Sequence, residues 1–268
     1  MAAMGLDLTK IASDYWENGV VSPVPLLTRE EALDHRRRLE SVEADLGSLH
    51  YIDKVHTALT SPLELATHPA VLDVVESLIG PDILLYNSTY IIKEPNTETF
   101  VAWHQDLTYW GLLEDDAQVS MWLALSPATD ESGCMAMIPG SHRTGRREHE
   151  QDTSDGNLLL LGQRLTGVDP TGGVSCSLQP GEASFHHGWT VHTSAPNLSE
   201  DRRIGLNVQY LAAHNGHLKG HGSALLVRGE DRYGHFAADR GATSDLDPAA
   251  VEAWRVLDAQ MKEWFKNA

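Results

Sequence analysis

The chain contains little cysteine and few basic residues, and both shortages limit what it can be. Its 268 residues include two cysteines, Cys134 and Cys176, and no CxxC pair. This argues against a zinc ribbon or a disulfide framework and favours a reducing, cytoplasmic compartment. Lysine and arginine number 20 against 38 aspartate and glutamate residues, which gives a net charge of −18. Such an acidic surface repels nucleic acid, so we expect no nucleic-acid partner.

Several patterns that identify common folds and enzymes are also missing. No apolar run approaches the roughly 18 residues of a membrane-spanning helix. The N-terminus lacks the charged and apolar regions of a signal peptide, so we expect no membrane association. The absence of a GxGxxG motif and of alternating strands and helices argues against a Rossmann domain. No HExxH motif of a zinc peptidase is present.

The first part of the chain, about residues 1–82, is expected to be helical. Within LLTREEALDHRRRLESVEADLG, Thr28 is a candidate N-cap and Glu31 its capping-box partner. A second helix is predicted in THPAVLDVVESLIGP, with Pro69 near its start and Gly80 at its end.

From residue 83 the pattern changes to short β-rich segments bounded by Pro, Gly or Asp. They predict a β core over about 83–215, interrupted by a polar, Gly-rich loop or lid at about 143–175. An amphipathic helix is expected at about 247–266, with its apolar stripe on a sheet. Helices followed by many short strands favour an α+β fold with an antiparallel barrel or sandwich.

The segment WHQD places His104 and Asp106 two residues apart. On a strand, both side chains would project from the same face. Imidazole together with carboxylate suits a mid-row divalent metal, which would need a third ligand from elsewhere. For this fragment alone, a hydrogen-bonded His–Asp pair without a metal is the alternative.

A second candidate segment, FHHGWTVHTSAPNLSEDRRIGLNVQY, contains three histidines and ends in a strand with one polar face. Alternation puts Arg203, Gly205, Asn207 and Gln209 on one side of that strand. This face either contacts solvent or lines a polar cavity. In a cavity, Arg203 could bind a carboxylate through two parallel hydrogen bonds.

Three ordered segments, WHQD, DESGCMAMIPGSH and GWTVHTSAPNLSEDRRIGLNV, resemble the phytanoyl-CoA dioxygenase family of Fe(II)- and 2-oxoglutarate-dependent oxygenases. The earlier YWENGVVSPVPLLTREEA resembles the opening segment of that family, so the likeness spans residues 15–210. It implies a single domain over residues 1–268, built as a double-stranded β-helix (a jelly-roll, cupin-like barrel) with N- and C-terminal helices packed on the sheet.

The resemblance also implies roles for individual residues. His104, Asp106 and His192 would form the two-histidine, one-carboxylate triad that holds Fe(II). Arg203 would bind the distal carboxylate of 2-oxoglutarate, and Ser194 would donate a hydrogen bond to it. O2 would be the second cosubstrate, and the products would be succinate, CO2 and a hydroxylated substrate.

Further roles are expected for neighbouring residues. Arg202 is an alternative partner for the carboxylate, although it lies on the opposite face of the strand. His186 and His187 are interpreted as barrel-wall residues or as residues that support the ligands. Asn87 and Lys93 are candidate cosubstrate-binding residues, and a solvated strand lysine is the alternative for Lys93.

Contacts to the substrate are predicted for five residues. The candidates are Tyr109, Trp110, Asn207, Gln209 and Arg143. The aromatic residues of this region, which include Trp122, could form a cage for a quaternary amine or could be ordinary packing. Arg143 could meet an anionic group, or it could be a solvated residue of the lid.

We therefore predict a hydroxylase of a small polar metabolite, such as an aminophosphonate or a betaine-like compound. The carboxylate of Asp106 favours hydroxylation over halogenation. Two alternatives stay open: a non-catalytic jelly-roll module that binds a metal or small ligand, and a cupin-like isomerase or zinc hydrolase. The sequence predicts no oligomeric state.

Overall fold

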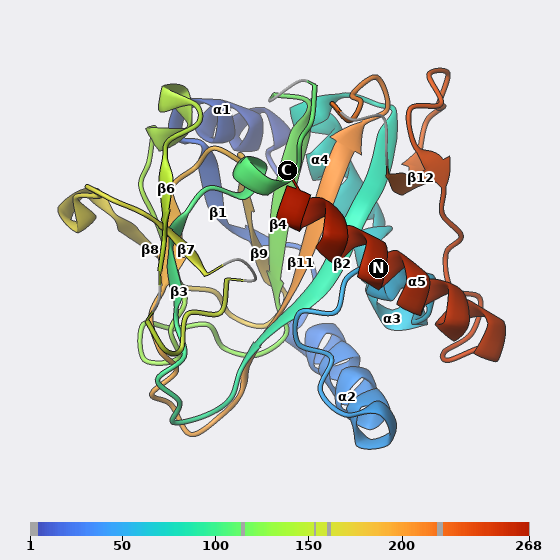
Figure 1. The fold of residues 1–268 in the computed structure, drawn as a ribbon, viewed down its shortest axis with the longest axis horizontal. Coiled ribbons are helices and arrows are strands. Elements are labelled where there is room, and N and C mark those ends of the chain that lie inside the picture. Colours follow the sequence, from blue (N-terminus) through green and yellow to red (C-terminus); the bar gives the residue numbers. More distant parts are fainter. Residues whose placement is uncertain (1–4, 114–115, 153, 160–161, 219–221, 268) are drawn as a thin grey trace.

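The computed structural model of the chain describes residues 5–113, 116–152, 154–159, 162–218 and 222–267. Within these ranges the fold is α+β, with two main sheets and helices at both ends of the chain (Figure 1). The helices are α1 (Leu8–Asn18), α2 (Arg29–Leu46), η1 (Val55–Thr57), α3 (Thr60–Ala66), α4 (Pro69–Ile79), η2 (Asp106–Tyr109), η3 (Ser141–Thr144), η4 (Pro170–Gly172) and α5 (Pro248–Asn267).

The major sheet has seven strands in the order β1-β9-β4-β11-β2-β12-β13. All neighbouring pairs are antiparallel except β12 with β13. The strands are β1 (Val20–Pro25), β9 (Glu182–His186), β4 (Gln118–Ala124), β11 (Arg203–Ala212), β2 (Ile83–Lys93), β12 (Ser223–Arg228) and β13 (Ala237–Ala238).

The minor sheet has four short antiparallel strands in the order β3-β10-β5-β8. They are β3 (Val101–His104), β10 (His192–Ser194), β5 (Met135–Met137) and β8 (Val174–Cys176). A separate hairpin pairs β6 (His149–Gln151) with β7 (Gln163–Leu165). Figure 1 shows β3 and β8 on one side of the molecule, beside the long strands of the major sheet. The predicted two-sheet architecture is confirmed.

The main core lies between the major sheet and the N-terminal helices. The apolar face of β11, from Ile204 to Tyr210, is fully buried in one cluster with Val71, Val74 and Val75 of α4. Burying this face against α4 leaves the opposite, polar face of β11 turned toward the minor sheet. At the other end of the chain, Trp254 of α5 joins the same cluster. The predicted packing of the C-terminal helix on the sheet is therefore confirmed.

The secondary structure of two segments differs from the prediction. The N-terminal part is not wholly helical, because Val20–Pro25 forms edge strand β1 beside β9. The segment at 143–175 is not one long loop, because it contains β6, β7 and the start of β8, which pairs with β5. These short strands depend on partners far away in the sequence. None of the helices in the described part of the chain combines the length and the hydropathy that crossing a bilayer requires.

Candidate metal centre and pocket

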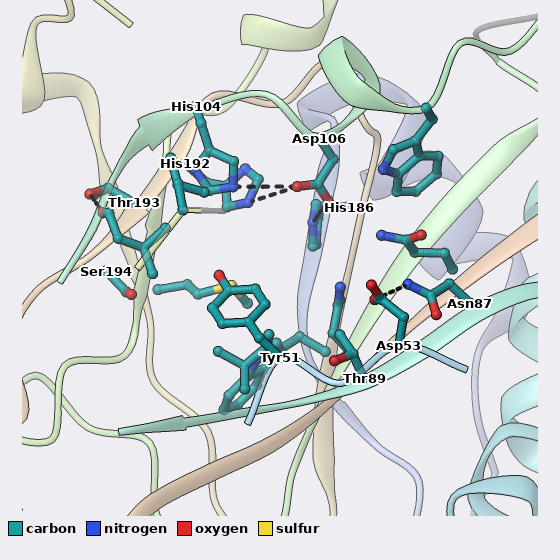
Figure 2. Close-up of a pocket in the computed structure, with 18 of the residues that line it drawn as sticks. Tyr51, Asp53, Asn87, Thr89, His104, Asp106, His186, His192, Thr193 and Ser194 are labelled. Atoms are coloured by element: carbon teal, nitrogen blue, oxygen red, sulfur yellow. Dashed lines mark hydrogen bonds and ion pairs between the residues drawn. The ribbon is translucent and has the colours of Figure 1, made fainter. Parts of the chain in front are cut away.

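The three predicted metal ligands lie together at one end of a pocket between the two sheets (Figure 2). His104 ends β3 and His192 begins β10, and the two residues are directly paired across these antiparallel strands. Asp106 is the first residue of η2. Its Oδ1 lies 3.3 Å from Nε2 of His104 and 3.6 Å from Nε2 of His192.

The expected reason for the proximity of His104 and Asp106 was wrong. Strand alternation would place both on one face, but β3 stops at His104. The chain then turns into the 3-10 helix η2, and this turn brings the carboxylate of Asp106 next to the imidazole. The geometry of the pair thus depends on the turn and not on the strand period.

Both imidazoles are oriented so that their Nε2 atoms can bind a metal. Nδ1 of His104 lies 2.9 Å from the carbonyl oxygen of Ala102, and Nδ1 of His192 lies 2.9 Å from that of Thr190. A carbonyl oxygen only accepts hydrogen bonds, so Nδ1 carries the proton in each ring. Burial, together with the adjacent His104, lowers the pKa of His192 to about 3, which keeps the ring neutral.

The donor set therefore fits a divalent cation. Two Nε2 atoms and one carboxylate oxygen converge within 4.8 Å of one another. Two histidines and one carboxylate with open positions are typical of non-haem Fe(II) sites. Thiolate ligands, which favour softer metals, are not part of this donor set, and both cysteines are buried and free.

The second oxygen of Asp106 is fixed by two residues of the major sheet. Ser120 donates a hydrogen bond from Oγ to Oδ2 at 2.9 Å, and Nε2 of His186 lies 3.2 Å from the same oxygen. These contacts turn Oδ1 toward the histidines. His187, in contrast, pairs with Oδ1 of Asp116 at 3.1 Å, away from the three ligands.

Arg203 lies in the same pocket and is almost completely buried. Its side chain is 1% exposed, and Nη1 donates to the carbonyl oxygen of Gly133 at 3.1 Å. Nε and Nη2 find no hydrogen-bond partner in the described residues. Burial lowers the pKa of Arg203 to about 10, since no carboxylate compensates its charge.

The position of the guanidinium is set by an aromatic ring. It stacks over Trp122 of β4, 5.0 Å from the ring centroid. This ring can lie against β11 only because residue 205 is glycine: a Cβ there would approach Cζ2 of Trp122 to 2.0 Å. Trp122 was considered only as part of an aromatic cage and Ser120 was not predicted at the site, although both alternate with apolar residues along β4 and face the pocket side.

Lys93 is buried beside Arg203, so the solvated alternative for this lysine was wrong. The two residues are paired across β2 and β11. Nζ of Lys93 donates to Oγ of Ser194 at 2.7 Å and to its carbonyl oxygen at 3.0 Å, and it also contacts the carbonyl oxygen of Ala195. Burial and the charge of Arg203 lower the pKa of Lys93 to about 6.

The polar face of β11 lines the pocket and does not contact bulk solvent. Gln209 is directly opposite Ser120 on one side and Asn87 on the other, and Ser120 is opposite His186. These four residues form one polar row across the major sheet. Asn207 also lines the pocket. Of the two alternatives for this face, the cavity is the one that the structure shows.

Other predicted residues lie apart from the metal ligands. Trp110 and Trp122 both line the pocket, in different apolar clusters, and the ring of Trp122 already lies against the guanidinium of Arg203. The side chain of Tyr109 lies outside the described part of the structure. Arg143 is exposed on η3, where Nη2 donates to the carbonyl oxygen of Glu17, and it does not line the pocket.

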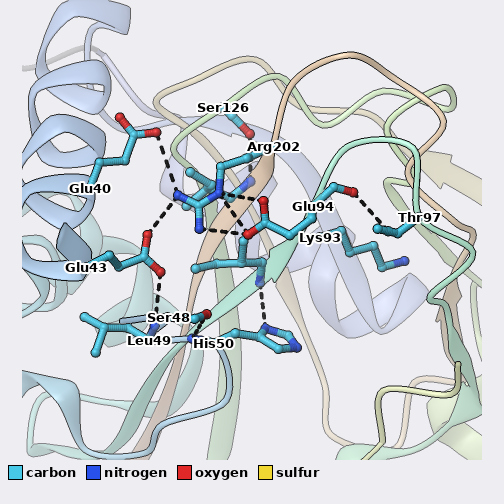
Figure 3. Close-up of polar contacts among 12 residues, drawn as sticks. Glu40, Glu43, Ser48, Leu49, His50, Lys93, Glu94, Thr97, Ser126 and Arg202 are labelled. Carbon is cyan, nitrogen blue, oxygen red and sulfur yellow. Dashed lines mark hydrogen bonds and ion pairs between the residues drawn. The ribbon is translucent and has the colours of Figure 1, made fainter. Parts of the chain in front are cut away.

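Arg202 is excluded as the carboxylate partner. It points to the outer side of the sheet, where Nη1 lies 2.8 Å from Oε2 of Glu43 and Nη2 lies 3.0 Å from Oε1 of Glu94 (Figure 3). Its charge is therefore already compensated, unlike that of Arg203.

Comparison with known proteins identifies a family and several structures that the chain resembles. The family model described as phytanoyl-CoA dioxygenase (PhyH) matches residues 15–205. A probable alpha-ketoglutarate-dependent hypophosphite dioxygenase of Stutzerimonas stutzeri is 29% identical over 189 residues, covering 68% of this chain and 65% of that protein. The first three curated relatives are covered to 65%, 54% and 45%, so the chain spans about half to two thirds of their length.

Solved structures resemble nearly the whole chain. A non-haem monooxygenase, ThoJ in its apo form, is 29% identical with a TM-score of 0.85, covering 96% of this chain and 98% of ThoJ. The alpha-ketoglutarate-dependent carbocyclase SnoK from nogalamycin biosynthesis is 24% identical with a TM-score of 0.67, covering 92% of this chain and 97% of SnoK. The second likeness shows the shared fold alone.

Proposed function

Because the chain belongs to the phytanoyl-CoA dioxygenase family, we propose that it is an Fe(II)- and 2-oxoglutarate-dependent oxygenase that hydroxylates a C–H bond of a small polar metabolite. One observation carries the proposal. Three candidate metal donors and a buried guanidinium with two unpartnered nitrogens among the described residues line the same pocket. A non-catalytic metal-binding module has no use for the guanidinium.

The metal would be held by Nε2 of His104, Nε2 of His192 and Oδ1 of Asp106. When bound, Fe(II) with 2-oxoglutarate and O2 supplies the oxidation, in which 2-oxoglutarate becomes succinate and CO2 and the substrate C–H becomes C–OH. Three protein ligands leave positions open for the cosubstrates. The carboxylate at position 106 occupies a ligand position that a halide would need, which favours hydroxylation.

Arg203 and Lys93 would bind the distal carboxylate of 2-oxoglutarate. The free Nε and Nη2 atoms of Arg203 match the two oxygens of a carboxylate. Lys93, fixed by Ser194, adds a second positive group beside it. The incoming anion would offset the cost of burying both groups, and Trp122 would keep the guanidinium in the orientation that binds it.

For the substrate, a small phosphorus compound such as an aminophosphonate is supported by the hypophosphite dioxygenase among the relatives. A betaine-like compound has less support, because the guanidinium of Arg203 already lies over the ring of Trp122. Arg143, the predicted partner of an anionic group, lies outside the pocket. A cytoplasmic location stays a prediction, based on two cysteines that are both buried and free.

The first experiment tests cofactor chemistry without knowledge of the substrate. Anaerobic addition of Fe(II) and 2-oxoglutarate should produce a weak visible charge-transfer band. Admission of O2 should then release succinate, and one member of a panel of phosphonates, betaines, amino acids and acyl thioesters should accelerate it. A binding module would give neither band nor succinate, and a zinc hydrolase or isomerase would not depend on 2-oxoglutarate.

A further inference from the structure

The pocket has a second polar end, across from the metal ligands, to which the proposed function assigns no role. Figure 2 shows Asp53 and Asn87 across the pocket from His104 and His192. Asp53 is 6% exposed and lines the pocket, although it is a carboxylate. Burying a carboxylate is costly unless it has a charged or hydrogen-bonding partner, so its surroundings indicate what it binds.

Asp53 is held rigidly by its own backbone. Its amide donates to Oδ1 of Asp258 at 2.9 Å, and its carbonyl oxygen accepts from Nε1 of Trp254 at 2.6 Å. Asn87 donates from Nδ2 to Oδ1 of Asp53 at 2.7 Å. Oδ2 receives no hydrogen bond from any residue that the structure describes. One oxygen of a fixed, buried carboxylate is therefore left for a ligand.

Neighbouring lysines do not neutralise this carboxylate. Nζ of Lys54 lies 2.8 Å from Oδ2 of Asp239, and Nζ of Lys262 lies 2.7 Å from Oδ2 of Asp258. Each lysine thus has an acidic partner of its own, and Asp53 remains as one unmatched negative charge. Burial raises the pKa of Asp53 to about 6, in agreement with a missing cation.

Gln209 supplies an independent observation at the same end. It is 7% exposed and lines the pocket, and its Oε1 has no hydrogen-bond partner among the residues that the structure describes. It is directly opposite Asn87 on β2. A buried amide oxygen without a donor is rare in native structures. Two acceptor atoms at this end, Oδ2 of Asp53 and Oε1 of Gln209, therefore receive no hydrogen bond from the described residues.

From these contacts we propose that the Asp53 end of the pocket binds a cationic hydrogen-bond donor of the substrate, an ammonium group, with Gln209 as the second acceptor. The inference rests on the proposed function and makes the substrate an amine. The polar row gives an estimate of the distance between the ammonium group and the oxidised carbon. Asn87 and Ser120, which donates a hydrogen bond to Asp106, are two strand spacings apart, about 10 Å. The ammonium group would lie at about that distance from the oxidised carbon.

Hexylamine and its uncharged counterpart 1-hexanol are suitable probes, because they differ only at the end that Asp53 would bind. Binding to the Fe(II)- and 2-oxoglutarate-loaded protein is measured by calorimetry. We expect the wild type to bind hexylamine about 10- to 100-fold more tightly than hexanol, the range of a charge-assisted hydrogen bond. Asp53→Asn should remove that preference.

Glu200→Gln is the matched control, because it removes one negative charge from an exposed turn, and it should retain the preference. Gln209→Leu should weaken hexylamine binding with Asp53 intact, and it keeps the test valid if Asp53→Asn does not fold. Equal binding of amine and alcohol by the wild type, or an unchanged preference in Asp53→Asn, would overturn the inference. If the charge-transfer band forms but amine and alcohol bind equally, only the ammonium site is refuted. If the amine is preferred but no charge-transfer band forms, only the proposed oxygenase chemistry is refuted.

Discussion

Arg203→Met should greatly weaken 2-oxoglutarate binding while the protein stays folded. The substitution keeps an unbranched side chain over Trp122 and removes only the buried charge. A carboxylate left buried without its charged partner costs about 3–5 kcal/mol, which corresponds to a roughly 100- to several-thousand-fold rise in Kd. Because Lys93 remains beside the carboxylate, we expect the lower end of that range.

The assay is an anaerobic titration of the Fe(II)-loaded protein with 2-oxoglutarate, followed by the visible band and by calorimetry. Arg202→Met is the matched control, because the adjacent arginine pairs with Glu43 and Glu94 on the outer side. Such partly exposed pairs contribute about 0–1 kcal/mol to stability, so the Kd of 2-oxoglutarate should not change. If Arg203→Met binds within threefold of the wild type, or if Arg202→Met loses as much affinity, the assignment of the carboxylate site is wrong.

Three further predictions concern the metal and the buried lysine. Asp106→Ala should weaken Fe(II) binding by more than the roughly 10- to 100-fold typical of supporting residues, whereas Asp116→Ala, an exposed acid, should not; metal titration decides between them. His186→Phe should weaken Fe(II) binding within that 10- to 100-fold range, because one contact to Oδ2 of Asp106 is lost. An unchanged affinity for Fe(II) would exclude a positioning role for His186. Burial and the neighbouring guanidinium lower the pKa of Lys93 to about 6 in the folded protein, whereas the pKa of an unfolded lysine is about 10.4. Between these two pH values the unfolded state binds more protons than the folded state. The free energy of unfolding of the ligand-free protein therefore rises with pH in this range. Lys93→Met should flatten this rise in urea titrations at pH 7 and 9, and an equal slope in both proteins would contradict the shift.

Local signals in the sequence were sufficient for helices α2 and α4. The capping box between Thr28 and Glu31 is present, with the amide of Thr28 donating to Oε2 of Glu31 at 2.8 Å. Helix α4 begins at Pro69, and Gly80 caps its end. Strand β1 was not predicted, because VVSPVP is short and contains two prolines. Only its partner β9 makes it a strand, and such a partner cannot be read from a local pattern.

The metal ligands were predictable in identity but not in geometry. Spacing and family likeness selected His104, Asp106 and His192, and the structure brings them together. The turn that orients Asp106 was not predicted, because nothing in WHQD shows where the strand ends. Their role as iron ligands stays a proposal.

Asp53 was not predicted to be at the pocket at all. It lies in a connecting segment before η1, where a single acidic residue normally faces solvent. Only the contacts from α5 and from Asn87 bring it inside. Arg143 shows the opposite error, since a basic residue near a motif turned out to bind a helix carbonyl on the surface.

The direct pairing of His104 with His192 makes ion affinity a measure of strand register. A slip of one residue between β3 and β10 would turn one imidazole to the opposite face, so a chain that is only partly folded has no complete set of donors. An ion bound between these strands acts as a cross-link in the native state alone, and at a hundredfold excess over Kd it adds about 2.7 kcal/mol of stability. Most of that gain falls on the short strands of the minor sheet, while β2 and β11, joined along ten register pairs, hold together without it.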